Sequence, residues 1–166
     1  MRILGIDPGS RVTGYGIVDR QASEVGFVTC GTIRTGGERD FSRRLLVIFE
    51  GLCQVIERHR PDVAAVEDLF LAHNPRSALK LGQARGAAVV AAMQNRLDVH
   101  DYTPRMVKQA VAGYGQADKE QVQRMVGILL HLDGSPSSDA ADALAVAICH
   151  ANHVGHLAAV GRRAGA

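Results

Sequence analysis

The alternation of apolar and polar residues in the first 34 positions predicts three strands. The runs 2–7, 14–20 and 25–34 are rich in apolar and β-branched residues, which favour strands. The first run stops at Pro8-Gly9-Ser10, and proline next to glycine is a strong turn signal. Because the connections between the three runs are short, we expect an antiparallel meander.

From residue 41 onward, helical and strand patterns alternate. Apolar residues between positions 41 and 60 recur three and four residues apart, which predicts an amphipathic helix that ends at Pro61. The remaining segments are assigned as strands at 62–67 and near 97–102, and as helices at about 75–96, from Pro104 behind a Thr103 cap, at about 118–131, and from Ser138 to about His153. Strands that alternate with helices imply parallel pairing, with helices on the sheet faces. We therefore expect an α/β fold, a five-stranded mixed β-sheet flanked by α-helices, with a site outside the carboxyl ends of its central strands.

Composition indicates a folded protein of ordinary domain size. Of the 166 residues, 46% are hydrophobic and 22% are charged, and the formal net charge is only +2, which excludes a disordered chain. No apolar run approaches the roughly 20 residues of a bilayer span, so we expect no membrane association. An acid and a proline within the first eight residues argue against a signal peptide. Cys30, Cys53 and Cys149 are widely spaced, which predicts buried thiols in a reducing cytoplasm.

Four carboxylates stand in or at the ends of predicted elements. Asp7 and Glu67 each close an apolar strand, whereas Asp139 and Asp142 lie three residues apart on one face of the last helix. A strand-end acid is often only the first residue of a loop, and Asp139 suits a first helical turn beside a Ser138 cap. Asp142 fits no such explanation, because it is the only polar residue between positions 140 and 149. A buried lone carboxylate is costly unless a cation meets it.

The cation opposite Asp142 could be a remote side chain or a bound metal ion. Hard oxygen ligands favour Mg²⁺ or Mn²⁺ over Zn²⁺. Four acids from three elements, converging at one crevice, would hold two such ions. Two ions can clamp both the attacking and the leaving oxygen of a phosphodiester displacement. The pattern thus leaves open either ordinary strand-end acids or a two-metal phosphodiesterase site.

Five sequence blocks, taken together and in order, resemble the RuvC family of bacterial Holliday-junction resolvases. The blocks are GIDPGSRVTGYGIV at 5–18, ALKLGQARG at 78–86, VKQAV at 107–111, DKEQVQ at 118–123 and DAADALAVAI at 139–148. The resemblance runs from residue 1 to about 154, which we treat as one nuclease domain, and leaves 155–166 as a short flexible tail. It implies an RNase H-like fold and a homodimeric, divalent-metal-dependent endonuclease of recombination and repair. Such an enzyme cuts two opposed strands of a four-way DNA junction, leaves 5′-phosphate and 3′-hydroxyl ends, and works with the RuvA–RuvB branch-migration complex.

The resemblance also assigns roles to individual residues of the site. The family's acidic tetrad corresponds to Asp7, Glu67, Asp139 and Asp142, which would hold two Mg²⁺ (or Mn²⁺) ions for attack by a metal-activated water. Lys119 corresponds to a family lysine and is expected to stabilise charge in the transition state.

Two further residues carry over to DNA contact, and three positions depart from the family pattern. Lys108 corresponds to a family lysine, and Phe70 to a phenylalanine that either stacks on bases near the cut or packs in the core. Asp68 stands where many members have glutamine, and the segment before Lys119 differs at Tyr114 and Asp118.

The tract 73–108 carries six basic residues against two acidic ones, a net +4. Arg76, Lys80 and Arg85 progress along one side of the predicted helix. Such a run is usually a solvated face, but beside a carboxylate site we favour a phosphate-tracking surface. Three histidines spaced three residues apart, at positions 150, 153 and 156, form either a metal cluster or the basic end of a helix, and we favour the helix end.

Three other functions compete with a junction resolvase. GIDPGS also resembles the first phosphate loop of actin-like ATPases, which need two such domains, more than 166 residues supply. An RNase H-like nuclease acting on RNA is disfavoured by the blocks at 78–86 and 118–123. A non-catalytic junction-binding module is disfavoured by the complete tetrad. For the dimer interface, the small-residue segment 86–93 is a candidate, although it could equally lie against the sheet.

Overall fold

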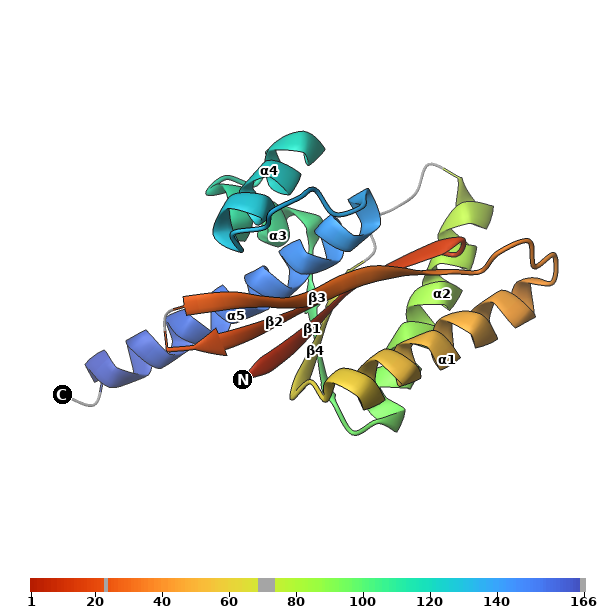
Figure 1. Ribbon diagram of the computed structural model, residues 1–166, viewed down its shortest axis with the longest axis horizontal. Coiled ribbons are helices and arrows are strands. Elements are labelled where there is room, and N and C mark those ends of the chain that lie inside the picture. Colours follow the sequence, from red (N-terminus) through yellow and green to blue (C-terminus); the bar gives the residue numbers. More distant parts are fainter. Residues whose placement is uncertain (23, 69–73, 165–166) are drawn as a thin grey trace.

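The computed structural model describes residues 1–22, 24–68 and 74–164, with side chains as far as His156. Its elements follow the predicted order: β1 (Arg2–Asp7), β2 (Val12–Gln21), β3 (Glu24–Arg34), α1 (Phe41–His59), β4 (Val63–Glu67), α2 (Pro75–Gln94), β5 (Asp98–Tyr102), α3 (Pro104–Ala112), α4 (Lys119–Leu129) and α5 (Ser138–Ala164). The strand order is β3-β2-β1-β4-β5. Strands β1, β2 and β3 pair antiparallel, and β1, β4 and β5 pair parallel. The predicted five-stranded mixed sheet is therefore confirmed (Figure 1).

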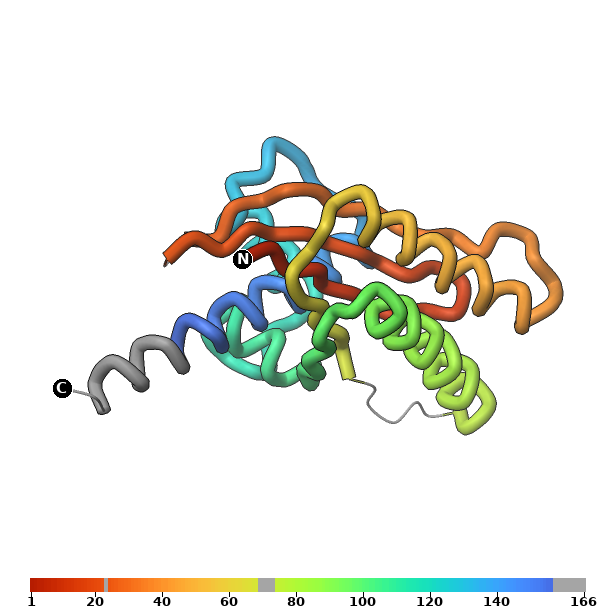
Figure 2. Tube along the Cα trace, turned by 90° about the horizontal axis from the view of Figure 1, so that it is seen from below, coloured from red at the N-terminus to blue at the C-terminus, as the bar shows by residue number. Residues whose placement is uncertain are grey.

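Helices cover both faces of the sheet. Helices α1 and α2 lie on one face, and α3, α4 and α5 lie on the other (Figures 1 and 2). Side chains of β1 alternate between the two layers, as the period of a strand requires. Leu4 and Ile6 pack with Ile48 of α1, whereas Ile3 packs with Leu144 of α5.

Glycines allow α5 to lie directly on the backbones of β1 and β2. A Cβ atom on Gly14 would lie 1.9 Å from the Asp139 carbonyl oxygen, and one on Gly5 would lie 2.0 Å from that of Ala143. Gly16, which pairs with Gly5, lies under Leu144 in the same way. The close contact fixes the start of α5 over the end of β1, where Asp7 pairs with Gly14.

Helix ends follow local capping chemistry, with one correction. The Asp40 side chain accepts a hydrogen bond from the Ser42 amide at 3.0 Å and caps α1. The predicted Thr103 cap is confirmed, because its hydroxyl accepts from the Met106 amide at 3.3 Å. Ser138 is not a cap, since α5 begins at this residue and its hydroxyl accepts instead from Gln123 Nε2 at 3.1 Å.

The predicted end of the last helix near His153 is wrong, because α5 continues to Ala164. The three histidines therefore do not mark a helix end. His150 is only 2% exposed, and its Nδ1 lies 2.8 Å from the hydroxyl of Tyr102 on β5. In the described part of α5, the histidines assemble no metal site.

Two predictions from composition can be compared with the structure. Within the described residues, no helix combines the length and apolar character that a membrane span requires. All three cysteines are free thiols, and Cys149 is buried, whereas Cys30 and Cys53 are only partly buried.

Candidate active site

Two adjacent parallel strands bring Asp7 and Glu67 to the same edge of the sheet. Strands β1 and β4 pair with Ile6 opposite Val66, so the two acids occupy equivalent positions one residue further on. The first turns of α5 cross this edge above Gly14 and carry Asp139 and Asp142. The four carboxylates isolated in the sequence therefore come from β1, β4 and α5 to one place.

Burial and mutual repulsion raise the pKa of the strand-end acids. The pKa of Asp7 rises to about 7, first because of burial and then because of the negative charges of Glu67, Asp142 and Asp139. The pKa of Glu67 is also raised, again by burial and then by Asp142. Because these carboxylates resist ionisation, any cation that binds among them stabilises their charged forms.

Lys119 supplies one such cation. Its Nζ atom lies 2.6 Å from Asp142 Oδ2, and the hydrogen bond between them is the main reason why the pKa of Lys119 is raised. The same ammonium offsets part of the rise in the pKa of Asp7 and of Glu67. The remote side chain that the sequence allowed as a partner of Asp142 is therefore this lysine.

The start of α4 is fixed by a capping box directly before Lys119. Asp118 Oδ1 accepts from the Gln121 amide at 2.8 Å, and Gln121 Oε1 accepts from the Asp118 amide at 3.0 Å. The Tyr114 hydroxyl donates to the same Gln121 oxygen at 2.6 Å. Two of the positions that depart from the family pattern thus hold the first turn of α4. The Asp-x-x-Gln spacing is the sequence signal that could have identified this role.

A cavity of about 210 Å³ joins two of the acids to two lysines. Its charged lining residues are Glu67, Lys108, Lys119 and Asp142, and Val107 and other apolar side chains of α3, α4 and α5 form the rest. It is smaller than the roughly 300–1,000 Å³ pockets that enclose drug-sized ligands. It therefore suits one group of a larger substrate that lies across the surface.

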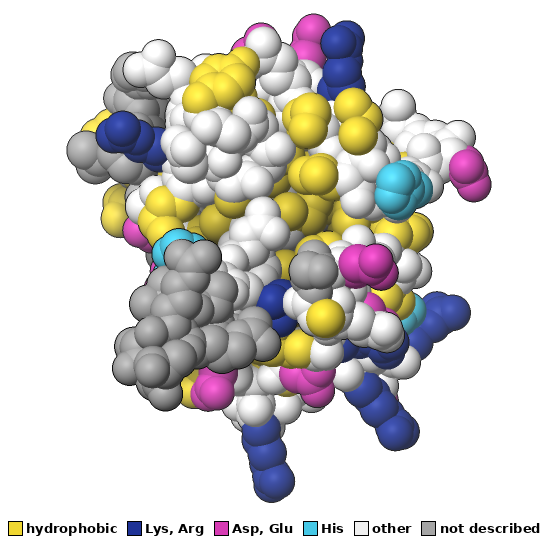
Figure 3. Space-filling view, turned by 90° about the vertical axis from the view of Figure 1, so that its left-hand side faces the viewer, with side chains coloured by type: hydrophobic (Ala, Val, Ile, Leu, Met, Phe, Trp, Pro, Cys, Tyr) yellow, Lys and Arg dark blue, Asp and Glu magenta, His cyan; other side chains and the backbone are white. Residues whose placement is uncertain are grey.

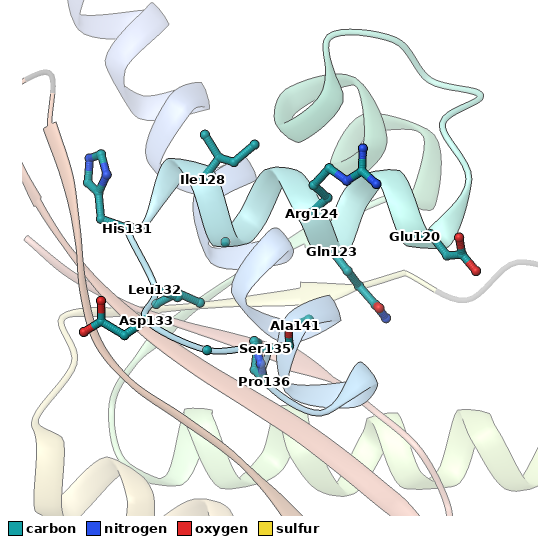
Figure 4. A pocket seen from close by; sticks show the side chains of 12 residues that line it. Glu120, Gln123, Arg124, Ile128, His131, Leu132, Asp133, Ser135, Pro136 and Ala141 are labelled. Atoms are coloured by element: carbon teal, nitrogen blue, oxygen red, sulfur yellow. The ribbon is translucent and has the colours of Figure 1, made fainter.

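A larger cavity, of about 740 Å³, lies on another flank of α4 (Figure 4). It is bounded by Arg124 of α4, by His131 and Asp133 of the following segment, and by Ala141 of α5. It contains none of the predicted site residues, so chemistry favours the smaller cavity as the active site.

The donor set at the sheet edge fits a hard divalent ion. All four acids offer carboxylate oxygens, which suit Mg²⁺ or Mn²⁺. As the described side chains stand, no three acidic, histidine or cysteine groups lie close enough to share one ion. Binding by three or more of these acids would therefore require their side chains to turn toward one another.

Arg85 of α2, predicted to contact DNA, is engaged within the protein. It forms ion pairs with Asp101 of β5 and, at 4.0 Å, with Asp68, which directly follows Glu67. Its side chain is 23% exposed, and its Nε atom makes no hydrogen bond. Arg85 thus ties α2 to the ends of β4 and β5, and its contact with DNA stays a prediction.

The other predicted DNA contacts lie at the start of α2. Arg76 is exposed in the first turn, and Lys80 Nζ lies 5.5 Å from the centre of the Phe41 ring on α1. Arg96 follows the opposite end of α2, so the basic tract 73–108 does not form one surface. Phe70 lies outside the described residues.

The sheet and its carboxylate edge define the class of nucleases with an RNase H-like fold. The family model described as crossover junction endodeoxyribonuclease RuvC matches residues 3–150. The chain therefore belongs to the RuvC family.

Two RuvC proteins agree with this assignment, and a third structure shares the fold alone. The crossover junction endodeoxyribonuclease RuvC of Geobacter metallireducens is 59% identical over 155 residues, which span 93% of this chain and 94% of the relative. The structure of T. thermophilus RuvC in complex with Holliday junction substrate superposes with a TM-score of 0.87 at 37% identity, covering 94% of this chain and 96% of that chain. The yeast mitochondrial Holliday junction resolvase Ydc2 shares the fold, with a TM-score of 0.68 at 14% identity over 93% of this chain and 82% of that chain.

Proposed function

We propose that this protein is a metal-dependent endonuclease that resolves four-way DNA junctions during recombination and repair. It hydrolyses phosphodiester bonds in two opposed strands and leaves 5′-phosphate and 3′-hydroxyl ends. The observation that carries the proposal is the meeting of four carboxylates and Lys119 at one sheet edge in a member of the RuvC family. The junction-bound T. thermophilus relative supports a four-way junction as the substrate.

We assign the chemistry to the residues of this edge. Asp7, Glu67, Asp139 and Asp142 would hold two Mg²⁺ or Mn²⁺ ions, which supply an activated water and a Lewis acid when bound. Lys119 is placed to offset negative charge that develops on the phosphate.

The small cavity contributes two further effects. Lys108 lines it beside Glu67 and offers a second positive charge to a phosphate oxygen. Its apolar part, which includes Val107 and Val122, keeps water away from the charged groups and so strengthens their interactions with the phosphate.

We infer that the protein acts as a homodimer, because two opposed cuts need two sites related by a two-fold axis. The surface of helix α2 supports this inference, because its two sides differ. Its inner side is buried in the core, and its outer side exposes an apolar stripe interrupted by small residues. The stripe consists of Leu79, Gly82, Gly86, Val90 and Met93. The predicted segment 86–93 therefore contributes to both the core and the proposed interface.

The dimer can be tested by placing a charge on this stripe. Val90→Glu on α2 should shift the protein from dimer to monomer in sedimentation equilibrium. Leu46→Glu, at a comparably exposed apolar position on α1, should leave the mass unchanged. A dimer that survives Val90→Glu would contradict the placement on α2.

Two finer parts of the proposal rest on family membership alone. The protein is expected to act in the cytoplasm, and the RuvA–RuvB branch-migration complex is expected to present the junction to it. Addition of that complex to a cleavage reaction should change the rate or the position of cutting.

Cleavage of a synthetic four-way junction tests the function. With Mg²⁺ and with Mn²⁺ separately, we expect paired nicks in opposed strands that a ligase can reseal. A linear duplex and an RNA–DNA hybrid of the same sequence should stay intact. Equal cutting of the hybrid would favour an RNA-directed nuclease, and binding without cutting would favour a junction-binding module.

A further inference from the structure

A second group of basic side chains lies at the same sheet edge as the candidate active site. The residues come from the turn after β1, the end of β3, the segment before α1, and the first turns of α1 and α2. We call them the basic ridge, and they are Arg11, Arg34, Arg39, Arg43, Arg44, Arg76 and Lys80. Only the last two belong to the basic tract that the sequence identified.

Contacts within the protein hold the parts of the ridge together. Strands β2 and β3 pair with Val12 opposite Arg34, and the Thr35 amide donates to the Arg11 carbonyl at 3.1 Å. Arg44 Nε donates to the Glu38 carbonyl at 2.6 Å, which fixes the segment before α1. The contact of Lys80 with the Phe41 ring joins the start of α2 to the start of α1.

The ridge continues outward from the carboxylates. Arg11 lies in the turn that follows Asp7, and α2 begins after the segment that follows Glu67. The turn after β1, the segment before α1, and the starts of α1 and α2 lie at one end of the molecule (right in Figures 1 and 2). A linear polyanion that reaches the carboxylates can therefore extend along the ridge.

Most of the ridge carries uncompensated charge. Among the described residues, Arg43 is the ridge member with an ion pair, at 3.9 Å from exposed Asp40. The two nearby acids are directed at backbone amides, since Glu38 accepts from the Asp40 amide at 2.9 Å and Asp40 accepts from the Ser42 amide. By contrast, Arg2, at the opposite end of β1, is paired with Asp19 at 2.8 Å. Figure 3 shows the opposite end of the molecule from the ridge, where basic and acidic side chains are interspersed.

The helix starts within the ridge carry basic side chains, which the positive end of a helix dipole disfavours. The first turn of α2 contains no acidic residue and follows the neutral Asn74 cap, although the positive end of a helix dipole favours acids there. The first turn of α1 also lacks acids, but its cap is the acid Asp40. Arg43, Arg44 and Arg76 stand in or beside these turns. A local preference broken at several neighbouring positions is expected at a functional surface, and a phosphate backbone is the ligand that gains from it.

We propose that the basic ridge binds the phosphate backbone of a duplex DNA arm that leaves the active site. The inference rests on the proposed function and names the surface that holds its substrate. The separate guanidinium groups contact phosphates and read no bases, so they position the arm without selecting its sequence. They also offset the repulsion between the site's own carboxylates and the incoming backbone.

The test compares two double variants at opposite ends of α1 with the same change in charge. Arg39→Gln/Arg43→Gln removes charge from the ridge, and Arg58→Gln/Arg60→Gln removes it from exposed positions at the other end of the helix. Binding of a fluorescent four-way junction is measured by anisotropy, with EDTA to prevent cutting. The NaCl concentration is varied between about 50 and 200 mM, because counterion release makes the affinity fall steeply over this range. Thermal unfolding of each variant is measured alongside.

We expect the ridge variant to bind the junction about tenfold or more weakly at low salt. The slope of log K against log salt should fall by about 0.9 for each phosphate that the variant no longer neutralises, while the control variant keeps the slope of the wild type. Thermal stability of the ridge variant should be unchanged or higher, because cations leave the start of a helix. Stepwise shortening of the junction arms should remove the difference between the variants.

Three results would overturn the proposal that the basic ridge binds a DNA arm. They are wild-type affinity and slope in the ridge variant, an equal loss in the control variant, and a difference that persists when the arms are truncated. The proposed function fails separately, if the wild-type protein binds the junction but cuts none of it in Mg²⁺ or Mn²⁺. A wild-type protein that does not bind the junction would overturn both.

Discussion

Lys119 Nζ lies 2.6 Å from Asp142 Oδ2 and so joins the start of α4 to the first turns of α5. The contact explains how an acid persists in a helix that is otherwise buried and apolar from Ala140 to Cys149. It also places the positive charge of α4 within the field of Asp7 and Glu67. In the proposed reaction the same ammonium faces the phosphate.

Lys119→Met should lower the single-turnover rate of junction cleavage by about a hundredfold, because removing a donor that stabilises transition-state charge has this order of effect. Lys119→Arg keeps the charge and should retain part of the rate. Arg124→Met, on the same helix but in the larger cavity, serves as the control and should cleave as the wild type does. A wild-type rate in Lys119→Met would contradict the assigned role.

Gly14→Ala should disturb the site without touching any of its side chains. The added Cβ atom would lie 1.9 Å from the Asp139 carbonyl oxygen, so α5 must move away from β2. We expect a loss of about 2 kcal/mol or more in the free energy of unfolding, as for other overpacked interiors, together with reduced cleavage.

Gly26→Ala on β3 is the matched control, because its nearest neighbouring atom lies 3.9 Å away. Urea unfolding of both variants measures the difference. If Gly14→Ala were as stable as Gly26→Ala, the close contact between α5 and the sheet would not position Asp139.

Asp7→Asn should stabilise the metal-free protein at neutral pH while it abolishes cleavage. The pKa of Asp7 is about 7 in the folded state and 3.8 by its ordinary value, so the folded protein binds the proton more tightly. Stability is therefore lost as the pH rises from about 4 through 7 in the wild type, and the variant escapes this loss. Because Asp7 is partly exposed, we expect a gain of about 1–3 kcal/mol, below the full value of the shift.

Chemical denaturation in EDTA at pH values of about 4 and 8 measures this effect. The difference between wild type and Asp7→Asn should be small at the acidic pH and complete at the alkaline pH. Asp133→Asn, at an acid outside the site, should show no such gain. A destabilised Asp7→Asn protein at the alkaline pH would contradict the repulsion among the four acids.

His150 should make the fold sensitive to acid in the opposite sense. Burial, together with the charges of His100 and His153, lowers its pKa to about 4, and the Tyr102 hydroxyl lies 2.8 Å from its Nδ1 atom. The unfolded chain therefore binds the proton more tightly, and stability is lost as the pH falls from about 6.5 to 4.

The contribution of His150 to the free energy of unfolding should decrease by up to about 3 kcal/mol over this range, against the opposite contribution of Asp7. His150→Gln cannot titrate at this position, so its stability relative to the wild type should increase as the pH falls over the same range, because the Asp7 contribution is common to both proteins. The same pH dependence in both proteins would show that His150 is not responsible.

The sequence predicted the element order and the four acids because both follow from local pattern. Asp7 and Glu67 end apolar strands, and Asp142 interrupts an apolar helix, which one-dimensional reading detects. The end of α5 was missed because Gly155 weakens the helical pattern, although this residue lies close to Arg20 in the fold.

What the sequence could not supply depends on packing between distant segments. The Lys119–Asp142 contact requires the docking of α4 on α5. The basic ridge joins Arg11 and Arg34 to the start of α2, while Arg96, in the same tract as Arg76, lies at the other end of that helix. Counting charges along the chain reveals neither the Lys119–Asp142 contact nor the basic ridge.

The central claim is that the acids at the sheet edge cut the junction and are not needed to hold it. The most direct test measures binding and cleavage of one synthetic four-way junction by wild type and by Asp7→Asn, in Mg²⁺ and in Mn²⁺. We predict that Asp7→Asn binds the junction at least as tightly as the wild type and produces no paired nicks with either ion. Cleavage by Asp7→Asn at the wild-type rate would contradict the account.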